Sequence, residues 1–171
     1  MYFRVIILGE HIGRYEKMHK LESDLNGAEL RIGIVMSRYN IDASEGLLDS
    51  CTAELEKNGV PPTNILMITV PGALEIPLAL QKMALTDQFD ALVALGAVVR
   101  GDTYHFEVVS KESAGGVTAV QLDTGIPVAN GILTTDTNDQ ALERMSQKDT
   151  EAARAAIEMV HLLRKLDEVV Q

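Results

Sequence analysis

The chain has 171 residues, of which 46% are apolar, and 25 acidic against 15 basic residues give it a net charge of −10. This length fits one domain whose core is large enough to fold without disulfides or metals. Nucleic-acid binding is not expected, because it depends on clustered Lys and Arg that neutralise phosphates, and the sequence has no such cluster.

The first 28 residues differ from the rest because they show no sustained hydrophobic period. We therefore expect residues 1–28 to be an N-terminal extension or tail, ahead of one α/β domain over residues 29–171. Residues 2–8, YFRVIIL, could form an extra strand but are too short to span a bilayer. The N-terminus also lacks the pattern of a signal peptide, so we expect a cytoplasmic protein.

From residue 30 onward, apolar runs of strand length alternate with segments of helical period. The expected strands are residues 30–37, 64–70, 89–99 and 127–135. The expected helices are residues 42–58, 73–85, 105–122, 138–145 and 150–170, with the segment MSQKDTEA, residues 145–152, as a loop before the last helix. This alternation predicts a parallel sheet of four strands with helices on both faces.

A single cysteine, Cys51, excludes an internal disulfide. It falls at four-residue spacing with Ala43, Leu47 and Leu55, on the apolar side of an expected helix. We predict that Cys51 is a small buried core residue rather than a reactive thiol.

The loop after the third expected strand carries the most conspicuous polar residues, within LGAVVRGDTYHFEVVS. Ligands of parallel α/β sheets bind at the carboxyl ends of the strands, where this loop emerges. Gly101 permits close backbone approach, and Asp102 and Thr103 are typical of a helix start, which offers free N–H groups to an anion. His105 follows in the first turn and could move a proton near neutral pH. An ordinary capped helix with a structural histidine fits the same residues.

Three other residues are candidates because of their place after expected strands. Tyr39 could stack on a planar ligand. Glu75 lies at the start of an expected helix. A carboxylate at this position could either be stabilised by the helix dipole or bind a ligand. Arg144 could pair with a phosphate or could simply be solvated. The sequence has no H-x-x-x-H or C-x-x-C pattern and no nucleotide-binding glycine loop, so neither a metal nor a nucleotide is predicted.

Five segments, taken together, resemble the lumazine synthase family of riboflavin biosynthesis, over about residues 30–160. They are RIGIVMSRYN, VPGALEIPLAL, FDALVALGAVVRGDTYHFEVVS, PVANGILTTDTNDQALER and AAIEM, in the family's order and spacing. The resemblance implies a flavodoxin-like three-layer sandwich. It also implies a transferase that condenses 5-amino-6-(D-ribitylamino)uracil with 3,4-dihydroxy-2-butanone 4-phosphate to give 6,7-dimethyl-8-ribityllumazine and phosphate.

The same resemblance implies no metal and no organic cofactor. It implies a homo-oligomer built from pentamers, with active sites between neighbouring subunits and riboflavin synthase as a candidate partner. Pentamer, decamer and sixty-subunit shell all stay open.

The resemblance also assigns roles to individual residues. His105 matches the proton-transfer residue, and Tyr39 matches the aromatic residue that stacks on the pyrimidine. The other matching positions are substrate-binding: Ala73, Leu74 and Glu75 at the ribityl chain and ring; Ala97, Val98 and Val99 along a second wall; Asp102, Thr103 and Arg144 at the phosphate; and Lys148 near the pyrimidine. Asn130 stands where relatives often have a phenylalanine that lines the ring.

Two other functions are compatible with the sequence. An archaeal-type riboflavin synthase would use a similar fold on the reaction's product, but the segment GAVVRGDTYHFEVV favours lumazine synthase. A non-catalytic flavin- or lumazine-binding shell protein would keep the pocket without turnover.

Overall fold

The computed structural model describes residues 20–170, apart from the side chains of residues 146–149 and 170. Its centre is a four-stranded sheet in the order β2-β1-β3-β4, and all strand pairs are parallel. The strands are β1 (Ile32–Ser37), β2 (Ile65–Val70), β3 (Ala91–Val99) and β4 (Val128–Thr135). The predicted α/β class and the four-stranded parallel sheet are confirmed.

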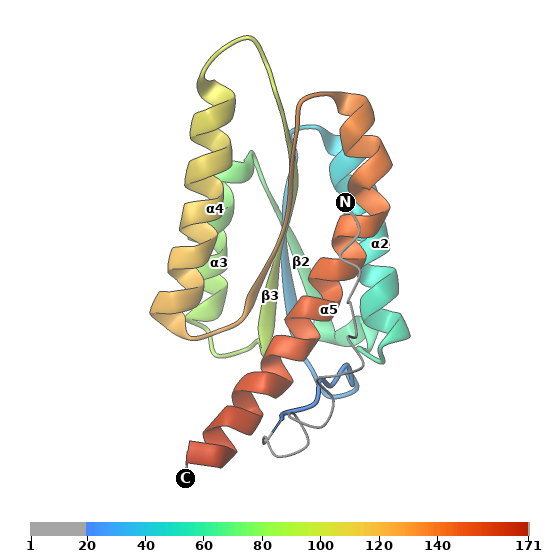
Figure 1. Ribbon diagram of the computed structural model, residues 1–171, viewed down its shortest axis with the longest axis vertical. Helices are drawn as coiled ribbons and strands as arrows, with labels where there is room; N and C mark the ends of the chain where they lie inside the picture. Colours follow the sequence, from blue (N-terminus) through green and yellow to red (C-terminus); the bar gives the residue numbers. More distant parts are fainter. Residues whose placement is uncertain (1–19, 171) are drawn as a thin grey trace, which may run out of the picture.

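Helices cover both faces of the sheet, which gives three layers. In Figure 1, α2 and α5 lie on one side of the sheet, and α3 and α4 lie on the other. The helices are α2 (Ile41–Lys57), α3 (Ile76–Ala84), α4 (His105–Thr124) and α5 (Asn138–Val170), with short 3-10 turns η1 (Pro62–Asn64) and η2 (Ala73–Glu75). Strands β2 and β4 form the two edges of the sheet.

One predicted boundary is wrong. Residues 145–152 were expected to form a loop, but α5 runs without interruption from Asn138 to Val170. The physical reason is that this stretch contains neither glycine nor proline, so polar residues alone do not end the helix.

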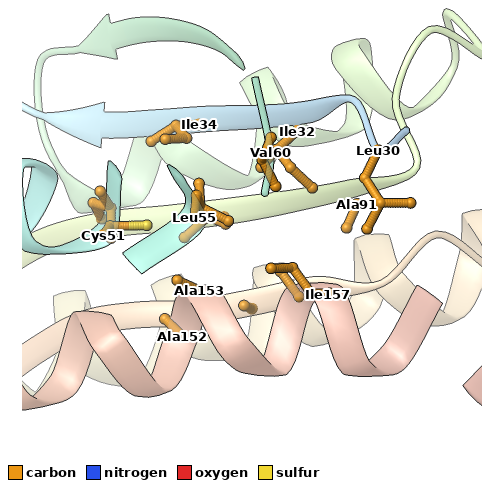
Figure 2. Packing of buried hydrophobic residues seen from close by; sticks show 14 of the residues in the cluster. Leu30, Ile32, Ile34, Cys51, Leu55, Val60, Ala91, Ala152, Ala153 and Ile157 are labelled. Carbon is orange, nitrogen blue, oxygen red and sulfur yellow. The ribbon is translucent and has the colours of Figure 1, made fainter. Parts of the chain in front are cut away.

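The core between the sheet and α2 and α5 is built from aliphatic side chains and alanines. Ile32 and Ile34 point from β1 toward this side, where Leu55 and Ile157 are also fully buried. Figure 2 shows Cys51 in the same cluster, which confirms the prediction of a buried thiol. Burial of each large aliphatic side chain contributes about 1.5–3 kcal/mol to folding.

A buried carboxylate joins α2 to α5. Glu54 is only 7% exposed, and its two oxygens accept hydrogen bonds from Arg154 Nε at 2.6 Å and Lys57 Nζ at 3.0 Å. The hydrogen bond from Arg154, followed by that from Lys57, lowers the pKa of Glu54 from 4.5 to about 2. Glu54 is therefore ionised throughout the physiological pH range.

On the other face, a glycine allows α3 and α4 to pack closely. A Cβ atom added to Gly116 would lie 2.5 Å from Cγ of Pro77, whereas one added to Gly115 would meet nothing within 4 Å. The close approach in this glycine pair therefore belongs to Gly116, and it lies inside the subunit.

Part of the expected N-terminal extension contacts the domain at the far end from the β3–α4 loop. The Gly27 N–H donates to the Asn58 carbonyl at 2.8 Å, and His161 Nε2 lies 2.7 Å from the carbonyl oxygen of Asn26. The extra strand expected at residues 2–8 lies outside the described residues. Within residues 20–170, no helix combines the length and the apolarity needed to cross a membrane.

Candidate active site

The candidate residues gather mainly around the loops that follow β1, β2 and β3. Because the four strands are parallel, these loops emerge from one end of the sheet. In Figure 1 the β3–α4 and β4–α5 connections both lie at the upper end of the molecule. This is the end at which ligands of such sheets bind.

Tyr39 and Glu75 lie together on either side of Gly72. The Gly72 N–H donates to Glu75 Oε2 at 2.9 Å. A Cβ atom at Gly72 would lie 2.8 Å from Tyr39 Cδ2 and 3.1 Å from Glu75 Oε2, so this position has no room for a side chain. Tyr39 itself is 70% exposed, so its ring is available to a planar ligand. Leu74 is exposed and Ala73 is buried beside them.

The end of β3 forms the floor between these residues and α4. The side chains of Ala97 and Val98 are buried in the core, at 3% and 8% exposure. The carbonyl oxygen of Ala97 accepts a hydrogen bond from Asn40 Nδ2 at 2.8 Å. Asn40, which links the loop after β1 to the end of β3 in this way, has a left-handed backbone with φ 55°. Contacts of a ligand with this wall would fall on the backbone and on Val99, which is partly exposed.

The predicted anion site lies in an exposed turn. Gly101, Asp102 and Thr103 are all exposed, and His105 is the first residue of α4 and is also exposed. The backbone N–H groups of Asp102 and Thr103 donate no hydrogen bond to any other described residue. The N-cap position is Tyr104, whose side chain makes no capping hydrogen bond, so Asp102 is not the N-cap residue of this helix.

Arg100 is a residue of this region that sequence reasoning did not include in the site. Its Nε donates to Asp136 Oδ1 at 2.7 Å, its Nη1 pairs with Glu107 Oε1, and its Cζ lies 4.1 Å from the centroid of the Phe106 ring. The hydrogen bonds to Asp136 and Glu107 raise the pKa of Arg100, and the hydrogen bond from Arg100 lowers the pKa of Glu107. The only sequence signal was that Arg100 lies in the same loop as His105, because its partner Asp136 is 36 residues away along the chain.

Asn130, Arg144 and Lys148 are not shown to join this group. Asn130 is exposed on the edge strand β4 and is level with Ala94 in the register. Since Ala94 precedes Val99 by five residues, Asn130 lies about 16 Å down the strand from the end of β3 at roughly 3.3 Å per residue. Arg144 is exposed on α5. Lys148 lies within residues 146–149, whose side chains are outside the described part of the structure.

A hollow of about 540 Å³ lies beside Asn130, between α4 and β4. The hydroxyl of Ser110 is buried there and has no hydrogen-bond partner among the described residues. The hollow is lined by residues of α4 and its N-cap and by residues of β4: Tyr104, Phe106, Glu107, Ser110, Lys111, Ser113, Ala114, Asn130, Ile132 and Thr134.

In residues 20–170, no three His, Cys, Asp or Glu side chains are arranged to hold a metal ion. An exposed aromatic ring, a carboxylate, free N–H donors and a histidine surround one end of the sheet.

The model of the 6,7-dimethyl-8-ribityllumazine synthase family matches residues 29–164. The chain belongs to this family. It is 69% identical over 160 residues to the 6,7-dimethyl-8-ribityllumazine synthase of Nitrosospira multiformis. The aligned region covers 94% of this chain and all of that relative.

Two further lumazine synthases are similar over almost their whole length. The protein from an Azoarcus species is 61% identical, with 91% of this chain and 99% of the relative covered. That from Nitrosomonas europaea is 60% identical, with 92% and 96% covered. All predicted site residues, from Tyr39 to Lys148, fall within the region matched by the lumazine synthase model.

Proposed function

We propose that the chain condenses 5-amino-6-(D-ribitylamino)uracil with 3,4-dihydroxy-2-butanone 4-phosphate to give 6,7-dimethyl-8-ribityllumazine and phosphate. This is the penultimate step of riboflavin biosynthesis. The observation that carries the proposal is the 69% identity to a lumazine synthase over that protein's full length. The positions of Tyr39, Glu75 and His105 at one end of the sheet support it independently.

The pyrimidine substrate is proposed to bind at the ends of β1 and β2. Stacking on the exposed ring of Tyr39 suits a flat heterocycle. Glu75 is held in place by the Gly72 N–H, so its remaining acceptor capacity can serve the ring or the ribityl hydroxyls. The backbone next to Ala73 and Leu74, and that from Ala97 to Val99, would enclose the rest of the molecule.

The phosphate of the second substrate is proposed to bind at the start of α4. The free N–H groups of Asp102 and Thr103 and the positive end of the helix dipole favour an anion there. Arg144 would be the cationic partner of this phosphate. Lys148 would lie near the pyrimidine.

The chemistry requires protons to be moved at several steps. The amine and the ketone form an imine with loss of water, phosphate is eliminated, and the second amine closes the ring with loss of another water. His105 begins the helix beside the proposed phosphate site, and its imidazole can serve as a general acid or base. Much of the acceleration would come from holding the two substrates in register.

We further propose that the active site is completed by a neighbouring subunit in a pentamer-based homo-oligomer. The level of Asn130 on β4 supports this proposal, since it lies about 16 Å along the sheet from Val99, the last of the site residues on β3. Asn130, with the hollow beside it, would then face the site of the next subunit. A cytoplasmic location and riboflavin synthase as a partner belong to the same proposal, because both follow from the place of the family in riboflavin biosynthesis.

The test is an assay of the purified assembled protein with both substrates, in which lumazine absorbance and phosphate release are followed together. Equal appearance of both products supports the proposal. Folded protein that binds flavin or lumazine but forms neither product would instead indicate a non-catalytic binding protein. Formation of riboflavin from the lumazine would indicate a riboflavin synthase.

The role of His105 is tested with His105→Ala. General acid–base catalysis is worth about 10²–10⁴-fold, so we expect turnover to fall by a factor in this range without disappearing. His161→Ala is the matched control, because it makes the same chemical change at the far end of the sheet, where His161 contacts Asn26. Complete loss of turnover in a His105→Ala protein that folds and binds normally would contradict the weight given to substrate positioning.

A further inference from the structure

Arg100 occupies the junction between the sheet and the helix that carries His105. It directly follows β3, and its backbone N–H donates to the Thr135 carbonyl at 2.9 Å, which extends the pairing of β3 with β4 by one residue. Its side chain then connects two segments that are not otherwise neighbours in sequence. One is the β4–α5 loop, through Asp136, and the other is the first turn of α4, through Glu107.

The first turn of α4 has little other support at its start. The N-cap residue Tyr104 makes no side-chain capping hydrogen bond, and the hydrogen bond from the His105 N–H to Thr103 Oγ1 is long, at 3.4 Å. A Cβ atom added at Gly101 would meet nothing within 4 Å, so the turn before the helix is open. Phe106 does pack partly against the core, and the guanidinium of Arg100 stacks on its ring. The residues that follow His105 are thus held by Arg100 on one side and by the core on the other.

The positive charge of Arg100 is neutralised within the subunit. Its guanidinium pairs with two carboxylates, Asp136 and Glu107, so the cluster of three carries a net charge of −1. A cation neutralised in this way adds little attraction for a phosphate. The geometry therefore favours a positioning role over a role in phosphate binding.

We propose that Arg100 is a positioning residue that fixes the first turn of α4, and with it His105, against the ends of β3 and β4. This inference rests on the proposed proton-transfer role of His105. A planar guanidinium suits the task because it can bond two carboxylates and stack on a ring at once, which an ammonium group cannot do. Misplacement of a catalytic group by about 1 Å can cost on the order of 10² in rate.

The test compares Arg100→Met, which keeps the apolar stem, with Arg100→Lys, which keeps the charge. Arg164→Met is the control, because Arg164 has a similar exposure and also forms an ion pair. Its partner is Asp90, at 2.6 Å, and this pair lies away from the proposed site. We expect Arg100→Met to lower kcat on the order of ten- to a hundredfold. In Arg100→Met, KM for the pyrimidine should stay within about twofold of wild type. The pH–rate profile of Arg100→Met should change in the limb that depends on His105, which is the limb that His105→Ala lacks. Arg100→Lys should recover part of the rate, and Arg164→Met should change neither quantity.

Hydrogen–deuterium exchange of a peptide covering residues 104–110 provides a readout that does not depend on turnover. Faster exchange in Arg100→Met than in wild type and Arg164→Met is expected. Unchanged exchange, or a kcat loss no greater than that of Arg164→Met, would overturn the proposal. If wild-type protein shows no turnover, or if His105→Ala turns over normally, the proposed function or the role of His105 fails, and the exchange result still decides whether Arg100 holds the helix start.

Discussion

Replacement of Glu54 by glutamine is expected to weaken the joint between α2 and α5. The substitution keeps the size and one acceptor oxygen of the side chain, but it removes the charge that pairs with Arg154 and Lys57. A pKa lowered from 4.5 to about 2 sets a ceiling of about 3 kcal/mol on the contribution of this charge to stability.

The expected effect is smaller than that ceiling because both cations are well solvated. Arg154 and Lys57 are 48% and 66% exposed, so water and salt screen their attraction to Glu54. We therefore expect Glu54→Gln to lower the free energy of unfolding at pH 7 by about 1–2 kcal/mol. Glu56→Gln, an exposed change on the same helix, should stay within about 0.5 kcal/mol of wild type.

The difference in the free energy of unfolding between wild type and Glu54→Gln should also become smaller as the pH falls. The pKa of Glu54 is lower in the folded protein than in the unfolded chain, so its contribution is fully present above about pH 4.5. As the pH falls from 4.5 toward 2, the folded carboxylate becomes protonated and the contribution is lost. Wild type and Glu54→Gln should therefore converge in stability across this window.

Urea unfolding followed by circular dichroism, at equal protein concentration from pH 7 down to pH 3, measures this difference. Equal protein concentrations matter because an assembled protein gains stability by mass action. If Glu54→Gln matched wild type at pH 7, the ion pair would contribute nothing. If the difference stayed constant down to pH 3, its origin would not be the ionisation of Glu54.

Two further predictions concern packing and the sheet end. Gly116→Ala should destabilise the protein by about 1–3 kcal/mol, because its Cβ would clash with the rigid ring of Pro77. Gly115→Ala, whose Cβ would meet nothing within 4 Å, should be neutral or stabilising by up to about 1 kcal/mol, and thermal unfolding of both variants tests this pair. Asn40→Ala should raise KM for the pyrimidine substrate and lower stability, because it removes the hydrogen bond to the Ala97 carbonyl and puts alanine at a left-handed backbone position. Asn40→Gly should restore only the part of the stability that is lost to the backbone, and it should not restore KM; a KM restored by Asn40→Gly would contradict the role given to the side chain.

The fold could be predicted largely from the sequence because its signals are local. Continuous apolar runs such as residues 30–37 predict strands buried on both faces, and helical spacing places Cys51 and Leu55 on one side of α2. Both are confirmed. The continuity of α5 was missed because the polar residues 145–152 carry little hydrophobic period, although they also contain nothing that breaks a helix.

The candidate site was predictable only in part. Tyr39, in the loop after β1, and His105, at the start of the helix after β3, could be placed from the rule on strand ends. Contacts between distant segments could not, since Glu54 and Arg154 are 100 residues apart and Arg100 and Asp136 are 36 apart. The level of Asn130 on β4 likewise depends on strand register, which the sequence alone does not specify.

Different side chains connect the two halves of the proposed site to the sheet. The pyrimidine side lies at Tyr39 and Glu75, and the Asn40 side chain ties the loop after β1 to the end of β3. The phosphate side lies at the start of α4, and Arg100 ties it to β4 and its following loop. A reaction that gains most of its rate from proximity depends on the distance between these halves more than on affinity for either substrate. Besides the rise in KM expected for Asn40→Ala, changes at Asn40 and Arg100 should therefore each reduce kcat with both substrates bound, and the two effects should be coupled because each change alters the same separation.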